Sequence, residues 1–226
     1  MLGLIDNIDR MERRVTKWLP SPPATQKTKL KQWPTEYTNK KTGKAYQPHN
    51  EEERLFVYQD YPTHMLLKGG EGAGKSVAGI IKTLNRIRRG MSGGMGSPDL
   101  EHFKKSLWPE FVNWCPVECI IERHQHRFAP GWEPSKAFTL VFKNELGGES
   151  FLICGGLDDP SSWEGPNLNF FDIDEARRHK TPEAIKVLTG RIRIPGPLGE
   201  PPQLYLTTTP RKHWLAVGGW DEGVDA

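Results

Sequence analysis

This 226-residue chain has few of the features that mark secreted, membrane-spanning or repetitive proteins. It has only three cysteines, an odd number that cannot form a complete set of disulfide pairs. This composition favours a reducing compartment. No apolar run approaches the roughly 20 residues of a membrane-spanning helix. The first residues, MLGLIDNIDRMERR, include acids and do not form a signal peptide. There are no internal repeats, and the net charge is only +3. We therefore expect a soluble intracellular protein with no membrane partner.

The length is sufficient for one large domain with its own core. The first 50 residues differ from the rest, because they contain ten basic residues, four acidic ones and five prolines, giving a local charge of +6. We expect a short helix and then a basic arm or linker over residues 1–50, followed by a globular domain over residues 51–226. The arm either contacts a polyanion or is a solvated tail.

Five short apolar segments are expected to be strands: His64–Lys68, Phe138–Phe142, Ser150–Cys154, Asn169–Ile173 and Gln203–Thr207. The turn sequence KNELGGE joins the second and third of them and predicts a β-hairpin. Helical patterns fall between the other strands. This alternation predicts an α/β fold with a doubly wound, mostly parallel sheet, helices on both faces and an added hairpin.

The helical patterns have recognisable ends. After Lys75, apolar residues recur at helical spacing as far as Ile87, and Gly90 is placed to end that helix. Gly93, Gly94 and Gly96 predict a flexible loop next. Ser97 then reads as the N-cap of a second helix with Pro98 at its first position, and Thr181-Pro182-Glu183 repeats this start signal for a third.

The strongest motif is GGEGAGKS, residues 69–76, which matches the phosphate-loop pattern G-x-x-x-x-G-K-[ST] at every fixed position. A predicted strand precedes it and a predicted helix follows it. The glycines let successive backbone amides turn toward phosphate oxygens, and the helix adds its positive end. Lys75 would reach the β- and γ-phosphates, and Ser76 would offer its hydroxyl to Mg²⁺. The residues expected to bind ATP are Gly69, Gly70, Glu71, Gly72, Ala73, Gly74, Lys75, Ser76 and Val77.

A second motif, NFFDIDEA, is a buried strand that ends in two acidic residues. We assign Asp174 to the metal and Glu175 to the general base that polarises the attacking water. Asp172 competes for the metal role, but it lies one step deeper on the same strand face.

A third motif, QLYLTTTP, is a strand that ends in Thr207, Thr208 and Thr209. Hydroxyls at a neighbouring strand end could sense the γ-phosphate or its water. The same pattern also fits an ordinary strand end before a proline.

These motifs, in this order, resemble the large terminase subunit of tailed bacteriophages, from about Gln47 to Trp214. The hairpin segment, DDPSSWEGPNLNFFDIDEA, LTGRIRIPG and LTTTPRKHW contribute to the resemblance. It implies a P-loop NTPase fold, and it implies that Thr207, Thr208 and Thr209 couple hydrolysis to DNA movement. The cofactors would be ATP and Mg²⁺. The implied partners are double-stranded DNA, a portal protein, a small terminase subunit and further copies in a ring. The implied location is the host cytoplasm, docked on the procapsid.

The chain departs from the family pattern at two positions. Glu71 and Glu164 stand where the family often has basic residues, so the arginine finger that completes a neighbour's site is unassigned. Arg191, in the LTGRIR segment, is our first choice for this catalytic cation. The other candidates are Arg177, Arg178 and Arg193.

Three further features leave alternatives open. We expect no nuclease domain of full large terminase subunits in this sequence, which implies either an excised motor domain or a system whose nuclease lies on another chain. Adenine contacts are expected from Tyr46 and Gln47, with Gln59 as a rival. A zinc site at Cys115, Cys119, His124 and His126 would have unusual spacing, and packed thiols beside a polar turn are the simpler interpretation.

The sequence thus predicts an ATPase that translocates viral double-stranded DNA into a procapsid. A helicase-like nucleic-acid motor, and a nucleotide-binding assembly module with weak hydrolysis, are the alternatives.

Overall fold

The computed structural model describes residues 33–165, 167–178 and 183–210. At its centre is a six-stranded sheet in the order β1-β6-β5-β2-β4-β3, parallel throughout except for the β3–β4 hairpin. The strands are β1 (His64–Lys68), β2 (Gly93–Ser97), β3 (Phe138–Lys143), β4 (Glu149–Gly156), β5 (Phe170–Ile173) and β6 (Gln203–Thr208). The predicted α/β fold with a mostly parallel sheet and an added hairpin is confirmed.

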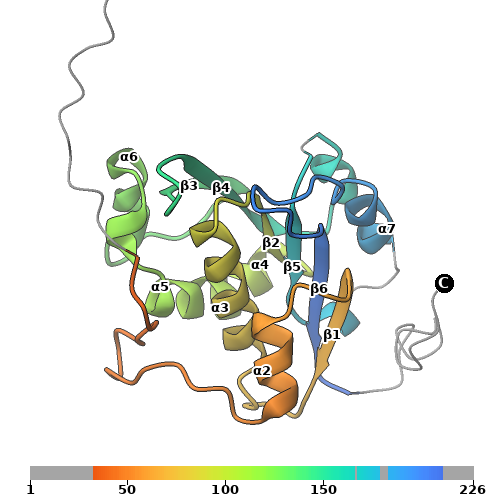
Figure 1. The fold of residues 1–226 in the computed structure, drawn as a ribbon, viewed down its shortest axis with the longest axis horizontal. Coiled ribbons are helices and arrows are strands. Elements are labelled where there is room, and N and C mark those ends of the chain that lie inside the picture. Colours follow the sequence, from red (N-terminus) through yellow and green to blue (C-terminus); the bar gives the residue numbers. More distant parts are fainter. Residues whose placement is uncertain (1–32, 166, 179–182, 211–226) are drawn as a thin grey trace, which may run out of the picture. The chain divides into compact units, whose positions relative to one another are not determined.

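The helices connect these strands and pack on the sheet (Figure 1). They are α2 (Glu51–Tyr58), α3 (Lys75–Arg88), α4 (Leu100–His102), α5 (Trp108–Trp114), α6 (Glu122–Gln125) and α7 (Glu183–Thr189). A π-helical segment spans Phe103–Leu107, and 3-10 turns span Val117–Cys119, His126–Phe128, Pro160–Trp163 and Ala176–Arg178. No helix among the described residues combines the length and apolar character needed to cross a membrane.

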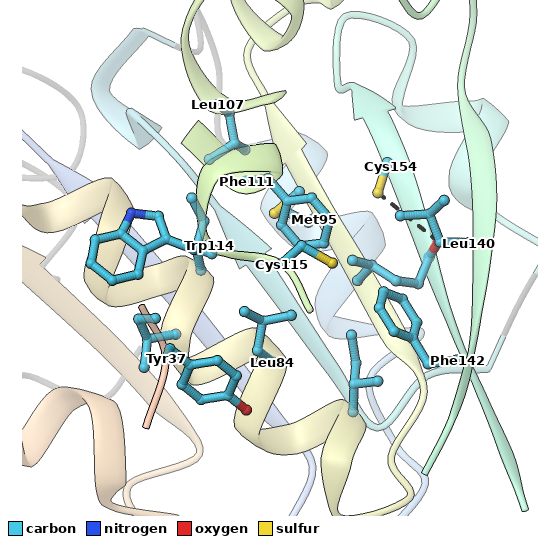
Figure 2. Packing of buried hydrophobic residues seen from close by; sticks show 14 of the residues in the cluster. Tyr37, Leu84, Met95, Leu107, Phe111, Trp114, Cys115, Leu140, Phe142 and Cys154 are labelled. Carbon is cyan, nitrogen blue, oxygen red and sulfur yellow. Dashed lines mark hydrogen bonds between the residues drawn. The ribbon is translucent and has the colours of Figure 1, made fainter. Parts of the chain in front are cut away.

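Apolar side chains pack on both faces of the sheet. Strand β5 shows why, because Phe170 joins a cluster with α2, α3 and α5 while its neighbour Phe171 joins a second cluster with α7. This alternation follows from the two-residue period of a strand. The first cluster is the larger, and Figure 2 shows Leu84 of α3, Phe111 of α5 and Phe142 of β3 within it. The sheet is therefore a buried layer between helices.

Strand β2 corrects the prediction of a flexible loop at Gly93, Gly94 and Gly96. This segment is a fully buried strand between β4 and β5. Its glycines leave room for large neighbours, since a Cβ on Gly93 would lie 2.5 Å from the carbonyl oxygen of Phe170, and one on Gly94 would enter the ring of Phe171. Here glycine serves close packing between strands.

The ends of the helices agree with the sequence in part. Helix α3 ends at Arg88, and Gly90 follows with φ of +89°, a left-handed conformation that favours glycine. The predicted N-cap at Ser97 is wrong, because Ser97 is still in β2 and the side chain of Asp99 caps α4 by accepting from the His102 amide. The start signal at Thr181 lies outside the described residues, and α7 is described from Glu183.

The described part of the expected N-terminal arm packs on the domain. Trp33, Tyr37 and Tyr46 are buried in the larger apolar cluster, and the indole Nε1 of Trp33 donates to the carbonyl of Lys143 at 2.7 Å. Isolated aromatic residues between prolines have no periodicity, so no sequence pattern indicates that residues 33–50 belong to the core. The domain therefore begins earlier than residue 51.

Lys82 is an unusual member of the interface between α3 and the sheet. It is 1% exposed, donates to the carbonyls of Phe56 and Gln59, and lies over the rings of Phe56 and Tyr205. Burial, assisted by Arg86 and Arg89 and opposed by Asp60 and Asp172, lowers its pKa to about 7. The charged form is thus disfavoured in the folded state.

The close packing of Gly93 against Phe170 predicts that one added methyl group will strongly lower the stability of the protein. Replacing Gly93 by alanine should destabilise the protein by about 1–3 kcal/mol or more, because a strand backbone cannot easily move away from the new Cβ. Urea unfolding measures this difference. Gly165→Ala is the control, since a Cβ there meets nothing within 4 Å. Equal stabilities of the two variants would contradict the packing role of Gly93.

The lowered pKa of Lys82 predicts a pH-dependent stability difference. Between pH 7 and pH 10 the unfolded chain keeps the Lys82 proton while the folded chain releases it, so stability from this group rises with pH. The free energy of unfolding of wild type minus that of Lys82→Met should therefore increase over this range, by at most about 1.4 kcal/mol per pH unit. Urea titrations at several pH values test this, and a flat difference would refute it.

Candidate nucleotide-binding site

The predicted phosphate loop lies between β1 and α3, at the carboxyl edge of the parallel strands. Gly72 and Gly74 have φ of +76° and +79°, which other residues adopt only with strain. Gly74 directly precedes α3 and provides no side-chain cap, so the first amides of the helix stay available to an anion. The Lys75 ammonium donates to the carbonyl of Gly70 at 2.8 Å. The loop therefore has the backbone that a bound phosphate requires.

The side chain of Asp174 faces this loop. Its Oδ1 accepts a hydrogen bond from the Ser76 hydroxyl at 2.8 Å and another from the Thr207 hydroxyl at 2.6 Å. Asp174 is 1% exposed, and its Oδ2 has no hydrogen-bond partner among the described residues. Burial raises its pKa, and the bonds from Thr207 and Ser76 oppose that shift. A buried carboxylate oxygen left without a partner beside a hydroxyl is a donor set that suits Mg²⁺.

Glu175 follows with both carboxylate oxygens engaged. Thr209 donates its hydroxyl to Oε1 at 2.9 Å, and the Nε of Arg177 donates to Oε2 at 3.0 Å. Burial alone would raise the pKa of Glu175, but the bonds from Arg177 and Thr209 and the charge of Lys75 lower it below its ordinary value. Glu175 therefore stays ionised, as a general base requires.

The three threonines that end β6 all contact this acidic segment. Thr207 bonds to Asp174, Thr209 bonds to Glu175, and the hydroxyl of Thr208 accepts from the amide of Arg177 at 3.3 Å. Strand β6 lies between β1 and β5, so its end adjoins both the phosphate loop and the acidic residues. The Thr208 carbonyl also accepts from the amide of Gly69 at 3.3 Å. The threonine segment thus connects both motifs.

The rival metal ligand Asp172 lies elsewhere. It is buried beneath α3, where its Oδ2 accepts a 3.4 Å bond from Thr83 and where Gly79 leaves room for the carboxyl group. Burial, assisted by the charge of Asp174, raises its pKa well above the ordinary value, which favours the neutral acid. Of the two carboxylates, only Asp174 contacts the loop serine.

The arginine candidates separate into two groups. Arg191 and Arg193 flank Ile192, which pairs with Leu168 before the start of β5, so both lie at the opposite edge of the sheet from Asp174. Within one chain, Arg191 is therefore far from the phosphate loop, and a role in a neighbour's site stays a prediction. Arg177 instead contacts Glu175, and Arg178 is exposed beside it.

The adenine candidates differ in their surroundings. Gln47 and Gln59 are exposed, and Tyr46 is buried with its hydroxyl donating to Glu53 at 2.7 Å. Buried Glu53 also bonds to Nδ1 of His49 at 2.9 Å, and the His49 ring occupies the space where Gly74 would have a Cβ. His49 and Glu53 were missed because only their four-residue spacing on the sequence connects them.

The suspected zinc residues do not form a metal cluster. Cys115 and Cys119 are buried free thiols, and Nδ1 of His124 accepts from the amide of Val141 at 3.1 Å. Within the described ranges, no three histidine, cysteine or acidic side chains gather closely enough to hold a metal ion.

The strand order, the phosphate loop and the acidic strand end define a P-loop α/β fold. Neither a protein-family model nor a curated protein sequence matches this chain. Among solved structures, the large terminase of thermophilic bacteriophage D6E in complex with ADP has a TM-score of 0.51 at 12% identity, over 76% of this chain and 42% of that one. The large terminase ATPase domain of Thermus phage P74-26 has a TM-score of 0.48 at 17% identity, over 80% of this chain and 73% of that one. The chain spans less than half of the D6E protein, and it shares the fold of a large terminase ATPase domain.

Asp174 and Asp172 should respond differently to replacement by asparagine. Wild type should bind a fluorescent ATP analogue more tightly with Mg²⁺ than with EDTA. Asp174→Asn should reduce this enhancement about tenfold or more, because it removes a carboxylate that we expect to hold the metal. Asp172→Asn should keep the enhancement, since asparagine resembles the neutral acid. Loss of the Mg²⁺ effect in Asp172→Asn alone would reverse the assignment.

Proposed function

We propose that this chain is the ATP-hydrolysing motor domain of a viral DNA-packaging machine, which moves double-stranded DNA into a procapsid. The observation that supports this most is the pair of hydrogen bonds from Ser76 and Thr207 to Asp174, with Glu175 next in the chain. They bring three separate motifs to one edge of the sheet. The shared fold with large terminase ATPase domains supports the same proposal.

Each group has a role in this proposal. The loop amides around Gly74 and the ammonium of Lys75 bind the phosphates of ATP. Ser76 and Asp174 would hold Mg²⁺, which would supply positive charge to offset that of the phosphates. Glu175 accepts a proton from the attacking water. The solved large terminase of phage D6E is in complex with ADP, which supports nucleotide binding in this proposal.

The partners follow from the same proposal. Further copies of the chain form a ring, in which a cation from a neighbour, Arg191 first, completes the site. Double-stranded DNA passes through the assembly, and the portal protein and small terminase subunit dock it on the procapsid in the host cytoplasm. A monomer should accordingly hydrolyse ATP slowly.

The central experiment is an ATPase assay with and without double-stranded DNA. Wild type should show turnover that DNA stimulates. Lys75→Ala should lose about a hundredfold or more of this turnover, because the ammonium stabilises charge that develops on the phosphates. Stimulation absent from the wild type would contradict a DNA motor.

Two further measurements separate the alternatives. Strand separation by the wild type would favour a helicase-like motor. A nucleotide-binding assembly module, favoured by Glu71 and Glu164 in place of basic residues, predicts negligible turnover that Glu175→Gln leaves unchanged. Under our proposal, Glu175→Gln abolishes turnover while ATP still binds.

A further inference from the structure

The carboxylate of Glu175 is enclosed by two donors from different strand ends. Arg177 comes from the 3-10 turn that follows β5, and Thr209 comes from the end of β6. The side chains of Arg177 and Glu175 are only 11% and 16% exposed. An exposed pair of this kind contributes little, whereas a largely buried pair with fixed geometry constrains both side chains.

The backbone at Glu175 is held in a costly conformation. Glu175 is the only described residue other than glycine with positive φ, at +49°. A left-handed residue with a side chain persists only where its surroundings hold it, and such residues gather at functional sites. The amide of Arg178 bonds to the Glu175 carbonyl at 2.9 Å, which closes the turn. This turn brings the side chains of residues 175 and 177 together.

Arg177 is also fixed to β6 through its main chain. Its amide donates to the hydroxyl of Thr208 at 3.3 Å, while Thr209 donates to the other oxygen of Glu175. The two strand ends are therefore joined by two hydrogen bonds, one between Arg177 and Thr208 and one between Thr209 and Glu175. A shift of the β6 end relative to β5 must move or break these bonds.

We propose that Arg177 is a positioning residue that sets the orientation of the Glu175 carboxylate and ties it to the β6 threonines. The inference rests on the proposed function, in which Glu175 is the general base. A carboxylate has about four lone-pair sites, so two donors orient it and still leave it able to accept from a water molecule. The guanidinium is mostly buried against its own chain's Glu175, so Arg177 is not the cation offered to a neighbouring subunit.

The test compares Arg177→Gln and Arg177→Lys in the full chain, with steady-state kcat and KM for ATP. Arg177→Gln should lower kcat about ten- to a hundredfold, because small misplacement of a catalytic group is costly. KM and the Kd of a fluorescent ATP analogue should change less than about threefold, since binding depends on other residues. Arg177→Lys should restore part of kcat, because an ammonium can still donate to Oε2.

Matched variants separate positioning from folding. Arg54→Gln removes an exposed Arg–Glu pair with Glu51 on α2 and should leave kcat unchanged. Thr209→Val should lower kcat, and combining it with Arg177→Gln should cost less than the product of the two single effects, because both act on one carboxylate.

Three outcomes are decisive. Full kcat in Arg177→Gln, with Lys75→Ala inactive, overturns the role of Arg177 and keeps the proposed function. Parallel losses in kcat, nucleotide affinity and thermal stability that lysine does not rescue show a structural role and also overturn it. Wild-type turnover that Lys75→Ala does not reduce overturns the proposed function itself and the inference with it.

Discussion

The hydrogen bond from Ser76 to Asp174 is the contact on which the rest of the site depends. It joins residues 98 positions apart, one at the start of α3 and one directly after β5. Parallel strands place their carboxyl ends at one edge of the sheet, so the loop after β1 and the residues after β5 and β6 meet there without further design. Asp174 is nearly fully buried, and a buried carboxylate destabilises a protein unless it is satisfied. One oxygen is satisfied by two hydroxyls, while the other has no partner among the described residues. A fold that keeps such a group tolerates its cost for the sake of a ligand.

The sequence predicted those strands whose own residues favour a strand. Strand β1 has the predicted bounds, and the run ending at Ile173 has the expected bounds within a residue. Strand β5 was predictable because a strand buried on both faces is continuously apolar. Strand β2 was missed because its glycines have low strand propensity by themselves. Glycines are needed in β2 because Phe170 and Phe171 on the adjacent strand leave no room for a Cβ. These two residues lie more than seventy positions away in the chain. No local pattern contains that information, and the same holds for the order of the strands.

In the candidate site too, some residues could be predicted from the sequence and others could not. Residues 69–76 were predictable because a phosphate loop needs fixed residue types at fixed spacing within one segment. The three threonines were predicted to end a neighbouring strand and to sense the γ-phosphate or its water, and their bonds to Asp174 and Glu175 were not predicted. Arg177 could only be one of several candidate cations in the sequence. Its contact with Glu175 depends on the left-handed turn at Glu175. In a regular strand, the side chains of residues 175 and 177 would point in parallel rather than toward each other.

The threonine hydroxyls connect the end of β6 to both acidic residues of the site. Thr207 donates to the carboxylate expected to hold the metal, and Thr209 donates to the one expected to accept a proton. A displacement of β6 by a fraction of a hydrogen-bond length would therefore disturb both sides of the site together, because one short strand end contacts both. A water molecule can take the place of either hydroxyl, because water also donates to a carboxylate. The guanidinium of Arg177 is harder to replace, since it brings a full positive charge to a largely buried carboxylate. If the end of β6 shifted, the Arg177 contact would still hold Glu175, because both residues lie in the same turn after β5.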